Sequence, residues 1–440
     1  MELAAAHVPA MDLLRLADTI TRAAAAPLSP SAIQALRRQH PPQVAALIVA
    51  MAAEQRRAQE KLGEGVWMVS AKAIRQATDQ IVAAYKAKLL GDGPVFDLCS
   101  GIGGDAIALA RRGTVVTIDC DPQITAMAAA NLHLARQRQA HRDAAAAPAA
   151  SPPSGQAIAV CADVTRYPIP PRLAVHIDPD RRPDQRRTVH PANYQPPLDF
   201  VQSLVAGRVA SIVKLAPAAD WIGEPGGREL AQQHHRQWIS FDRSVREQAL
   251  LGGDAMAAAG LTGGGRSAVR LLRDGTVQKF AVGPDVSKRI DAGETACDTI
   301  DLPPEMIFDF DPAVRGSGLS AALAEARGLA AIGSPTGFFG GSALPPERSL
   351  LQSFQTLWSG PADRKQIKQE LRKNGWCLQS VKVRGSDHDP AQLQRTLQPE
   401  SRRLACNQGT AADPDNVTLL IGRHARGVYA VLARAILAVQ

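Results

Sequence analysis

The chain has 440 residues, of which 45% are hydrophobic and 21% are charged. A chain of this length and composition can bury two or three ordinary hydrophobic cores, which excludes a protein that is disordered throughout. Its 50 Lys and Arg residues against 42 Asp and Glu residues give a formal net charge of +8. That surplus favours an anionic partner, with nucleic acid as the first candidate. Aromatic residues make up only 4%, which disfavours a protein that stacks bases along an aromatic platform.

The cysteines and the hydropathy pattern favour a cytoplasmic protein that uses no metal. The six cysteines are scattered and form no C-x-x-C pair, so we expect reduced thiols, with neither a zinc site nor a disulfide framework. The N-terminus, M-E-L-A-A-A-H-V-P, lacks a basic stretch followed by an apolar one. No apolar run reaches the roughly 18 residues needed to cross a bilayer, so no membrane partner is expected.

Residues 1–90 are predicted to form an N-terminal helical domain. They are rich in Ala, Leu, Gln and Arg, and their apolar positions recur at helical spacing, as in Val44, Leu47, Ile48 and Met51. Prolines punctuate the segment where helices are expected to start or stop. A small helical bundle follows from this pattern.

Residues 91–283 are predicted to form an α/β domain of the Rossmann-like kind. Short aliphatic runs alternate there with turns and helical segments, which predicts a mostly parallel sheet with helices on both faces. The predicted strands are V-F-D-L, V-V-T-I, A-I-A-V, A-V-H-I, S-I-V-K-L and Q-W-I-S-F, followed by a hairpin of S-A-V-R-L-L and Q-K-F-A-V across Asp274-Gly275. The alanine-rich segment 141–156 is interpreted as a surface insertion before the third strand.

A polar stretch after Gly283 leads to Leu302-Pro303-Pro304, a candidate linker, and residues 300–440 alternate short strands and helices. We expect a separate C-terminal α/β domain here. From residue 361 to the end there are 13 Lys and Arg residues against 7 Asp and Glu residues. This surplus of +6 is most of the net charge of the whole chain.

A glycine-rich loop follows the first predicted strand of the α/β domain. The run V-F-D-L-C-S-G-I-G-G-D leads from a strand through a sharp turn into a helix, and its candidate ligand-binding residues are Asp97, Cys99, Gly101, Gly103 and Gly104. Any doubly wound domain can carry such a turn, so the acid decides more than the glycines. An Asp at the strand end would repel the pyrophosphate of a dinucleotide. It suits a ligand with an amino group and a sulfonium, which is S-adenosylmethionine.

Two further acids stand at the ends of the next strands. In V-V-T-I-D-C-D-P, Asp121 precedes Pro122 and is interpreted as a helix N-cap, which leaves Asp119 to accept both ribose hydroxyls. The third strand ends at C-A-D-V, and Asp163 is a candidate for the adenine amino group or, alternatively, a loop acid that caps a turn. Acids on three successive strand ends resemble the cofactor half of class I methyltransferases.

The fourth strand runs into the candidate catalytic residues Asp178, Pro179, Asp180 and Arg181. They are expected at the carboxyl edge of the sheet, beside the topological switch point. In methyltransferases that act on base nitrogens, an Asp or Asn at this place accepts the amino protons, and an aromatic ring that follows it stacks on the base. Here Arg181 replaces the ring, and its guanidinium plane is able to stack on a base or clamp a phosphate. The alternative is a surface turn with a local Asp and Arg cluster.

Together, H-I-D-P-D-R-R-P, Y-Q-P-P-L and V-K-L-A-P resemble bacterial class I S-adenosylmethionine-dependent methyltransferases with a C-terminal THUMP-like domain. W-M-V-S-A-K-A-I-R-Q-A-T, D-P-A-V-R-G-S-G-L, G-F-F-G-G and V-K-V-R-G extend the resemblance over most of the chain beyond about Leu62. It implies that Trp67 and the segment from Ser70 to Thr78 lie over the cofactor pocket and that the last domain binds RNA. Tyr194 and Lys214, by their position after the catalytic strand and near the end of the fifth, are candidates for substrate contact. Asp180 departs from the small residue usual in this motif.

The leading hypothesis is an RNA methyltransferase, in which the central domain binds S-adenosylmethionine, Asp178-Pro179-Asp180-Arg181 positions a base, and the basic last domain contacts phosphates. Two alternatives stay open. One is a methyltransferase that acts on a small molecule or protein, and the other is a non-catalytic module that binds S-adenosylmethionine or RNA.

Overall fold

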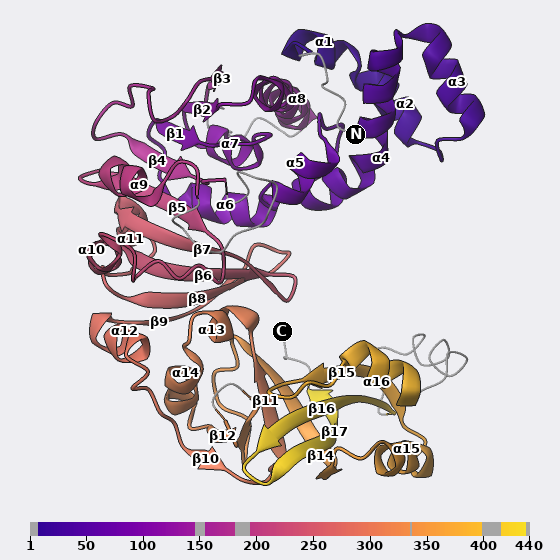
Figure 1. The fold of residues 1–440 in the computed structure, drawn as a ribbon, viewed down its shortest axis with the longest axis vertical. Coiled ribbons are helices and arrows are strands. Elements are labelled where there is room, and N and C mark those ends of the chain that lie inside the picture. The colour runs from indigo at the N-terminus through magenta and orange to yellow at the C-terminus, as the bar shows by residue number, and fades with distance from the viewer. Residues whose placement is uncertain (1–7, 146–154, 181–193, 335–336, 398–414, 437–440) are drawn as a thin grey trace. The chain divides into compact units, whose positions relative to one another are not determined.

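The computed structural model describes residues 8–145, 155–180, 194–334, 337–397 and 415–436 (Figure 1). The chain forms two compact units. The first unit comprises residues 1–237, 247–265 and 273–275, and the second comprises residues 238–246, 266–272 and 276–440. The two units are described separately below.

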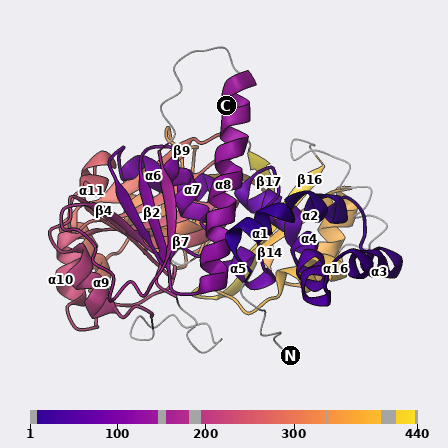
Figure 2. The same ribbon diagram turned by 90° about the horizontal axis from the view of Figure 1, so that it is seen from above.

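Helices fill the first ninety residues, as the apolar spacing predicts. They are α1 (Ala10–Arg15), α2 (Ala17–Ala24), α3 (Pro30–Gln39), α4 (Pro42–Leu62), α5 (Ala71–Gln76) and α6 (Gln80–Leu89). Ser29, Ser70 and Asp79 cap α3, α5 and α6 through side-chain oxygens that accept main-chain N–H groups. Helices α1 to α5 share a hydrophobic core with α8 (Pro122–Ala145), and Figure 2 shows α8 between them and strands β2 (Val115–Asp119) and β4 (Ala174–Ile177).

A nine-stranded sheet has the order β3-β2-β1-β4-β5-β7-β6-β8-β9. Its strands are β1 (Val95–Leu98), β2 (Val115–Asp119), β3 (Ala157–Cys161), β4 (Ala174–Ile177), β5 (Ala210–Leu215), β6 (His235–Phe241), β7 (Ser244–Gly253), β8 (Arg266–Leu271) and β9 (Val277–Val282). Strands β1 to β5 pair in parallel. The chain order reverses between β1 and β4, which is where doubly wound sheets bind their ligands.

The predicted Rossmann-like strands are all present, including the antiparallel β8–β9 hairpin. Strand β7 was not predicted, because its first half, S-V-R-E-Q, is polar; it pairs antiparallel with β5. The helices α7 (Gly104–Ala110), α9 (Leu198–Val205), α10 (Gly227–Gln233) and α11 (Asp254–Ala258) complete this part of the chain. Of the alanine-rich segment, residues up to Ala145 extend α8, and residues 146–154 lie outside the described residues.

The second unit contains an eight-stranded sheet with the order β10-β12-β13-β11-β14-β17-β16-β15. Its strands are β10 (Thr299–Ile300), β11 (Met306–Phe310), β12 (Ala330–Ile332), β13 (Phe339–Gly341), β14 (Leu351–Pro361), β15 (Cys377–Val383), β16 (Asn416–His424) and β17 (Gly427–Ile436). Its helices are α12 (Pro284–Asp291), α13 (Pro312–Gly316), α14 (Ser320–Arg327), α15 (Arg364–Lys373) and α16 (Pro390–Leu397). Separate apolar cores lie on the two faces of this sheet.

Four of the cysteines, Cys99, Cys120, Cys161 and Cys297, are free, whereas Cys377 is disulfide-bonded. The expectation of reduced thiols is therefore corrected for Cys377, because spacing along the sequence does not reveal which cysteines meet in the fold. In the part of the chain that the structure describes, no helix is both long enough and apolar enough to span a bilayer.

Candidate functional site

The site lies where the carboxyl ends of β1 and β4 meet. Asp178 directly follows β4, and its main-chain N–H donates to the Leu98 carbonyl at 3.1 Å. The glycine loop begins at Cys99, so the loop and the Asp178 segment start side by side at the switch point. The glycine loop and the segment that starts at Asp178, both predicted from the sequence, are therefore neighbours in the structure.

The glycine loop needs its glycines at two positions. Gly103 has a φ of +87° and is the N-cap of α7, a left-handed conformation that favours glycine. A Cβ at Gly104 would lie 3.2 Å from the Thr78 carbonyl oxygen. Gly101 also has a positive φ, and a Cβ built there would meet no atom of the described residues within 4 Å. A ligand therefore has room to approach the main chain at Gly101.

Asp119 is the last residue of β2 and is tied to the same loop. Its carboxylate accepts the Gly101 N–H and the Asp121 N–H, each at 3.0 Å. Burial raises the pKa of the Asp119 carboxyl, with the two main-chain bonds working against that shift. Asp121 accepts the N–H groups of Gln123 and Ile124, so it is the N-cap of α8 as expected from the sequence.

Asp163 follows β3 and binds its own turn. Its Oδ1 accepts the Thr165 N–H at 2.9 Å and the Thr165 hydroxyl at 2.7 Å. These bonds lower the pKa of the Asp163 carboxyl. The side chain is half exposed. The geometry is that of a turn-capping acid, the alternative left open by the sequence.

Asp97 lies inside the sheet, not at its surface. Its residue is fully buried, and its Oδ1 accepts from His176 Nδ1 at 2.7 Å. The two residues are register partners on β1 and β4. Lys86 Nζ lies 3.0 Å from His176 Nε2, and a protonated amine there makes Nε2 the acceptor and Nδ1 the donor. Burial raises the pKa of the Asp97 carboxyl, and its Oδ2 has no hydrogen-bond partner among the described residues.

Lys86, on α6, connects Asp97 to two more buried acids. Its Nζ lies 2.9 Å from Asp105 Oδ1 and 3.1 Å from Glu247 Oε1, and the Lys86 and Glu247 side chains are at most 2% exposed. Burial alone would lower the pKa of Lys86, but the charges of Asp105 and Glu247 outweigh it and raise the pKa. Burial likewise opposes ionisation of Asp105, yet the cations around it hold the pKa of that carboxyl well below its ordinary value.

A hydrogen-bonded chain leads from these acids to the edge of the sheet. The Thr78 hydroxyl donates to Asp105 Oδ2 at 2.5 Å and accepts from Lys214 Nζ at 3.1 Å. Lys214 Nζ also donates to Asp178 Oδ2 at 2.5 Å. The Lys214 side chain is 6% exposed and that of Asp178 is 25% exposed, so Asp178 is where this network reaches solvent.

The remaining candidates of the catalytic segment differ in placement. Pro179 is buried, and Asp180 forms a main-chain bridge with Gln195 while its Oδ1 accepts from Gln76 Nε2 at 3.4 Å. Arg181 lies outside the described residues. The interpretation of this segment therefore depends on Asp178 among the residues whose side chains are described.

The two aromatic candidates are packed in cores. Trp67 is 3% exposed, and its Nε1 donates to the Gly63 carbonyl while Arg138 stacks on the ring. Tyr194 is also 3% exposed, and its hydroxyl accepts from the Ala216 N–H. Because both rings are covered by protein, neither presents a face on which a substrate could stack. Lys214, the third candidate for substrate contact, instead supports Asp178.

Among the described residues, the thiols of Cys99 and Cys120 lie near this edge, and neither is activated as a nucleophile. Burial and the nearby Asp119 raise the pKa of the Cys99 thiol well above its ordinary value, which keeps it protonated. Burial also raises the pKa of Cys120. Within the described ranges, no three His, Cys, Asp or Glu side chains are grouped to hold a metal ion.

Sequence reasoning missed four members of the buried network: Lys86, Asp105, His176 and Glu247. A Lys inside an otherwise apolar helix, V-A-A-Y-K-A-K-L-L, and a His in the middle of a buried strand, A-V-H-I, were available signals. A buried charge requires a partner, so each predicts an opposite charge or an acceptor nearby. Which acids supply it depends on the tertiary fold.

Comparison with known proteins agrees with this fold. No protein-family model matches the sequence. The chain is 30% identical over 358 residues to an uncharacterized S-adenosylmethionine-dependent methyltransferase of Mycobacterium tuberculosis, in strain CDC 1551 and equally in strain H37Rv. The match covers 79% of this chain and 87% of each relative. The crystal structure of a protein assigned as a methyltransferase from Porphyromonas gingivalis W83 has the same fold, with a TM-score of 0.71 and 18% identity over 98% of this chain and all of that one.

A Rossmann-like sheet with a glycine loop and acids at its carboxyl edge defines a methyltransferase of the α/β class. The chain belongs to the S-adenosylmethionine-dependent methyltransferases, and S-adenosylmethionine is its methyl donor.

Proposed function

We propose that this methyltransferase modifies a base in RNA and that Asp178 receives the target nitrogen. One observation carries the proposal. Asp178 Oδ2 is held by Lys214, whereas Oδ1 has no hydrogen-bond partner among the described residues, and the side chain is 25% exposed at the switch point. An acceptor oxygen that is fixed at this place suits an exocyclic amino group or a ring N–H.

The residues around the glycine loop fit S-adenosylmethionine. The carboxylates of Asp97, Asp105, Glu247 and Asp178 face two ammonium groups, those of Lys86 and Lys214. Even with Asp97 protonated, the buried network keeps a surplus of negative charge, which favours a cationic ligand. When bound, S-adenosylmethionine supplies a methyl group that its sulfonium already activates.

We assign cofactor contacts to the glycine loop and the strand ends. Gly101 leaves the main chain open to the cofactor, Gly103 and Gly104 shape the turn at the start of α7, and Asp119 accepts the ribose hydroxyls. Cys99 belongs to the wall of the pocket, and Asp163, which caps its own turn, holds the loop after β3 on the adenine side. Asp97, being fully buried, lies beneath the loop and orients His176 through the 2.7 Å bond to its Nδ1.

Lys214 gives Asp178 its geometry. The 2.5 Å bond fixes one carboxylate oxygen, and Thr78 fixes Lys214 in turn. The other oxygen then accepts the proton that points away from the methyl group, which aims the nitrogen lone pair at the donor. Catalysis of this kind comes mainly from alignment, and a misplaced acceptor loses most of it. Pro179, Asp180 and Arg181 complete the segment that presents the base.

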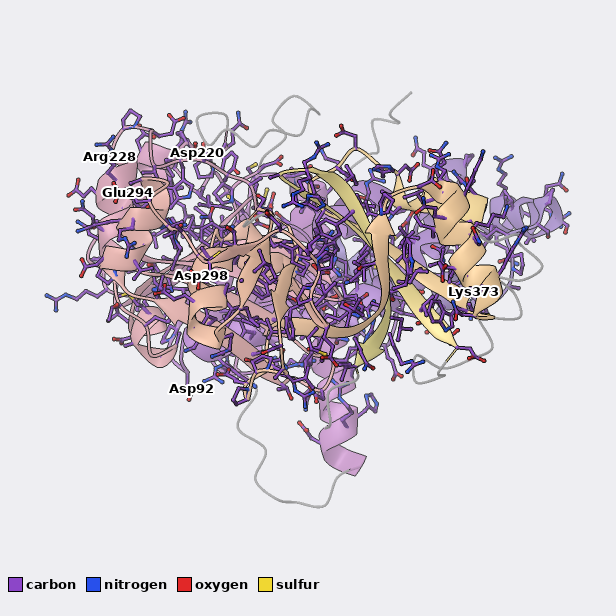
Figure 3. The ribbon with its side chains drawn as sticks, turned by 90° about the horizontal axis from the view of Figure 1, so that it is seen from below. Asp92, Asp220, Arg228, Glu294, Asp298 and Lys373 are labelled. Carbon is purple, nitrogen blue, oxygen red and sulfur yellow. The ribbon has the colours of Figure 1, made fainter. Side chains whose placement is uncertain are left out.

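The second unit supplies the support for RNA as substrate. We propose that it is a THUMP-like domain, on the strength of the D-P-A-V-R-G-S-G-L, G-F-F-G-G and V-K-V-R-G segments. Helix α15 alone carries Arg364, Lys365, Lys368, Arg372 and Lys373. Four of these five are exposed, as Figure 3 shows for Lys373.

Labelled methyl transfer tests this proposal. The purified protein is given S-adenosylmethionine with a labelled methyl group and total RNA from a strain that lacks this gene, and nucleosides are then analysed. We expect one labelled nucleoside in wild-type reactions and none with Asp178→Asn. Label in protein or small molecules, with none in any RNA fraction, would favour the alternative substrate classes.

A further inference from the structure

A cluster of three cations surrounds one buried acid in the second unit. Asp309, on β11, is 4% exposed. Its Oδ1 accepts from Arg315 at 3.0 Å and from Arg384 Nε at 3.2 Å. Its Oδ2 accepts from Lys382 at 2.6 Å and from a terminal nitrogen of Arg384 at 3.0 Å. We call these four residues the Asp309 cluster.

The Asp309 cluster joins two strands that are far apart in the order of the sheet. Strands β11 and β15 are separated in the sheet by β14, β17 and β16, yet Lys382 and Arg384 of the β15 segment reach Asp309 on β11. The sheet must therefore curl so that its β15 end turns back toward β11. The cluster lies on the inner face of this curl.

Strand periodicity explains which side chains face inward. On β11, Ile307 packs in the same inner core as Phe354, so Asp309, two residues on, points to that face. On β15, Val381 and Val383 pack against the core that includes residues of α15 and α16. Alternation then directs Lys382 and Arg384 inward.

The charges of the cluster do not balance. Three cations face one carboxylate, and Asp309 is the only acid that ion-pairs with any of the three among the described residues. The next acid along the chain, Asp311, ion-pairs with Arg270 at 3.8 Å and attracts Arg315 from a longer distance, so it offsets only part of the surplus. Arg243 adds a further like charge near Lys382. Burial and these neighbours lower the pKa of Lys382 despite its bond to Asp309.

Aromatic rings and a glutamine hold two of the cations in place, and all three cations keep part of their side chains exposed. Arg384 stacks over Phe338 at 5.7 Å and Lys382 lies 5.6 Å from the centre of the Phe354 ring. Lys382 also donates to Gln352 at 2.5 Å. The side chains of Arg315, Lys382 and Arg384 are nevertheless 25%, 20% and 23% exposed. Cations that are fixed in place and mostly buried, but still reach solvent, form a pre-organised site for an anion.

We propose that the Asp309 cluster binds a phosphate group, with Arg315, Lys382 and Arg384 as its ligands and Asp309 as the residue that positions them. Guanidinium groups match the oxygens of phosphate in pairs, and an ammonium adds a point charge. A bound phosphate also removes the cationic surplus. The group comes from an RNA backbone or from free phosphate. As an RNA contact, the site deepens the proposed function and rests on it; as a phosphate site, it stands apart from methyl transfer.

Two exposed cations of α12 provide the matched comparison. Lys288 and Arg289 belong to the same unit and carry the same two charges as Lys382 and Arg384, but neither ion-pairs with a carboxylate among the described residues. The paired variants are therefore Lys382→Gln with Arg384→Gln in one protein, and Lys288→Gln with Arg289→Gln in the other. Each loses one lysine and one arginine.

Binding of a fluorescein-labelled single-stranded RNA to the full chain is measured without S-adenosylmethionine, over roughly 50 to 200 mM salt. The cluster variant is expected to bind at least tenfold more weakly, and its salt slope to fall by about 1.4, at about 0.7 for each lost phosphate contact. The α12 variant is expected to bind less than threefold more weakly than wild type. Equal losses in the two variants, or no loss in the cluster variant, would overturn the proposal.

Two further measurements keep the test decisive. Should the double variant fail to fold, Lys382→Gln alone leaves both arginines on Asp309 and is expected to reduce the slope by about 0.7. Inorganic phosphate is then used as a competitor. Competition that depends on the cluster identifies the phosphate group itself as the ligand, whereas RNA binding without such competition identifies the strand backbone. Because no methyl transfer is measured, failure of the RNA-methylation assay leaves these outcomes intact.

Discussion

Each of the two units contains a cluster of buried charged side chains. The first cluster has a surplus of acids, and the second has a surplus of cations. In the first unit, Lys86 and Lys214 are outnumbered by the acids around them, and the network is almost closed to solvent except at Asp178. In the second unit, three cations share Asp309 and each keeps about a fifth to a quarter of its side chain exposed. An acid surplus suits a sulfonium, whereas a cation surplus suits phosphate.

The difference shows why a net charge is a weak guide to function. The surplus of +8 favours nucleic acid for the chain as a whole, yet the methyl-donor edge is acidic. Each cluster also depends on one residue that holds the others, Lys86 in the first and Asp309 in the second. Removing these residues tests whether the two clusters are built as described.

The largest effect on stability is expected from Lys86→Met. This change leaves Asp105 and Glu247 buried without their cation, which costs about 3 to 5 kcal/mol of unfolding free energy. Urea unfolding measures the loss. Lys88→Met, on the exposed side of the same helix, should change stability by less than about 0.5 kcal/mol. Equal effects of the two substitutions would show that the Lys86 network does not stabilise the fold.

Asp309→Asn is expected to destabilise the second cluster in a pH-dependent way. Although burial opposes ionisation, Lys382, Arg384 and Arg315 lower the pKa of the Asp309 carboxyl. A lowered pKa stabilises the fold above the ordinary value near 3.8 and ceases to do so as pH falls through the folded value. The unfolding free energy of wild type should therefore exceed that of the variant by about 2 kcal/mol at pH 7, and this difference should disappear in strong acid.

Asp285→Asn, at an exposed position on α12, is the control for this pH profile. Its unfolding free energy should equal that of wild type both at pH 7 and in strong acid. A difference between wild type and Asp309→Asn that is constant from pH 7 to pH 2.5 would mean that ionisation of Asp309 contributes nothing to the cluster.

Asp119→Ala sharpens the assignment of the acidic edge. Loss of a charged acceptor for the ribose hydroxyls should weaken S-adenosylmethionine binding about tenfold, which calorimetry measures. Asp121→Ala removes only the cap of α8, so it should lower stability by about 1 kcal/mol and leave the dissociation constant within twofold. An unchanged dissociation constant for Asp119→Ala would refute the ribose assignment.

The sequence predicts the loop and the strand ends of the site better than it predicts the buried side-chain contacts. Strand and turn signals locate the glycine loop, and the runs of acids at strand ends place Asp119 and Asp178 correctly at the carboxyl edge. Tertiary contacts decide the rest. Glu247 lies on β7, whose polar start hides a strand, and Trp67 and Tyr194 are buried in cores that local sequence does not reveal. The convergence of Arg315, Lys382 and Arg384 on Asp309 requires a curled sheet, which no local pattern predicts.

The most direct test of the central claim is single-turnover methyl transfer by Asp178→Asn at saturating S-adenosylmethionine, with Asp199→Asn as an exposed control. Loss of the fixed acceptor should slow transfer to RNA by about a hundredfold or more, within the range for a positioned acid or base, while the affinity for S-adenosylmethionine stays within twofold. A variant that transfers methyl groups as fast as wild type would contradict the account, because Asp178 would then have no part in the reaction.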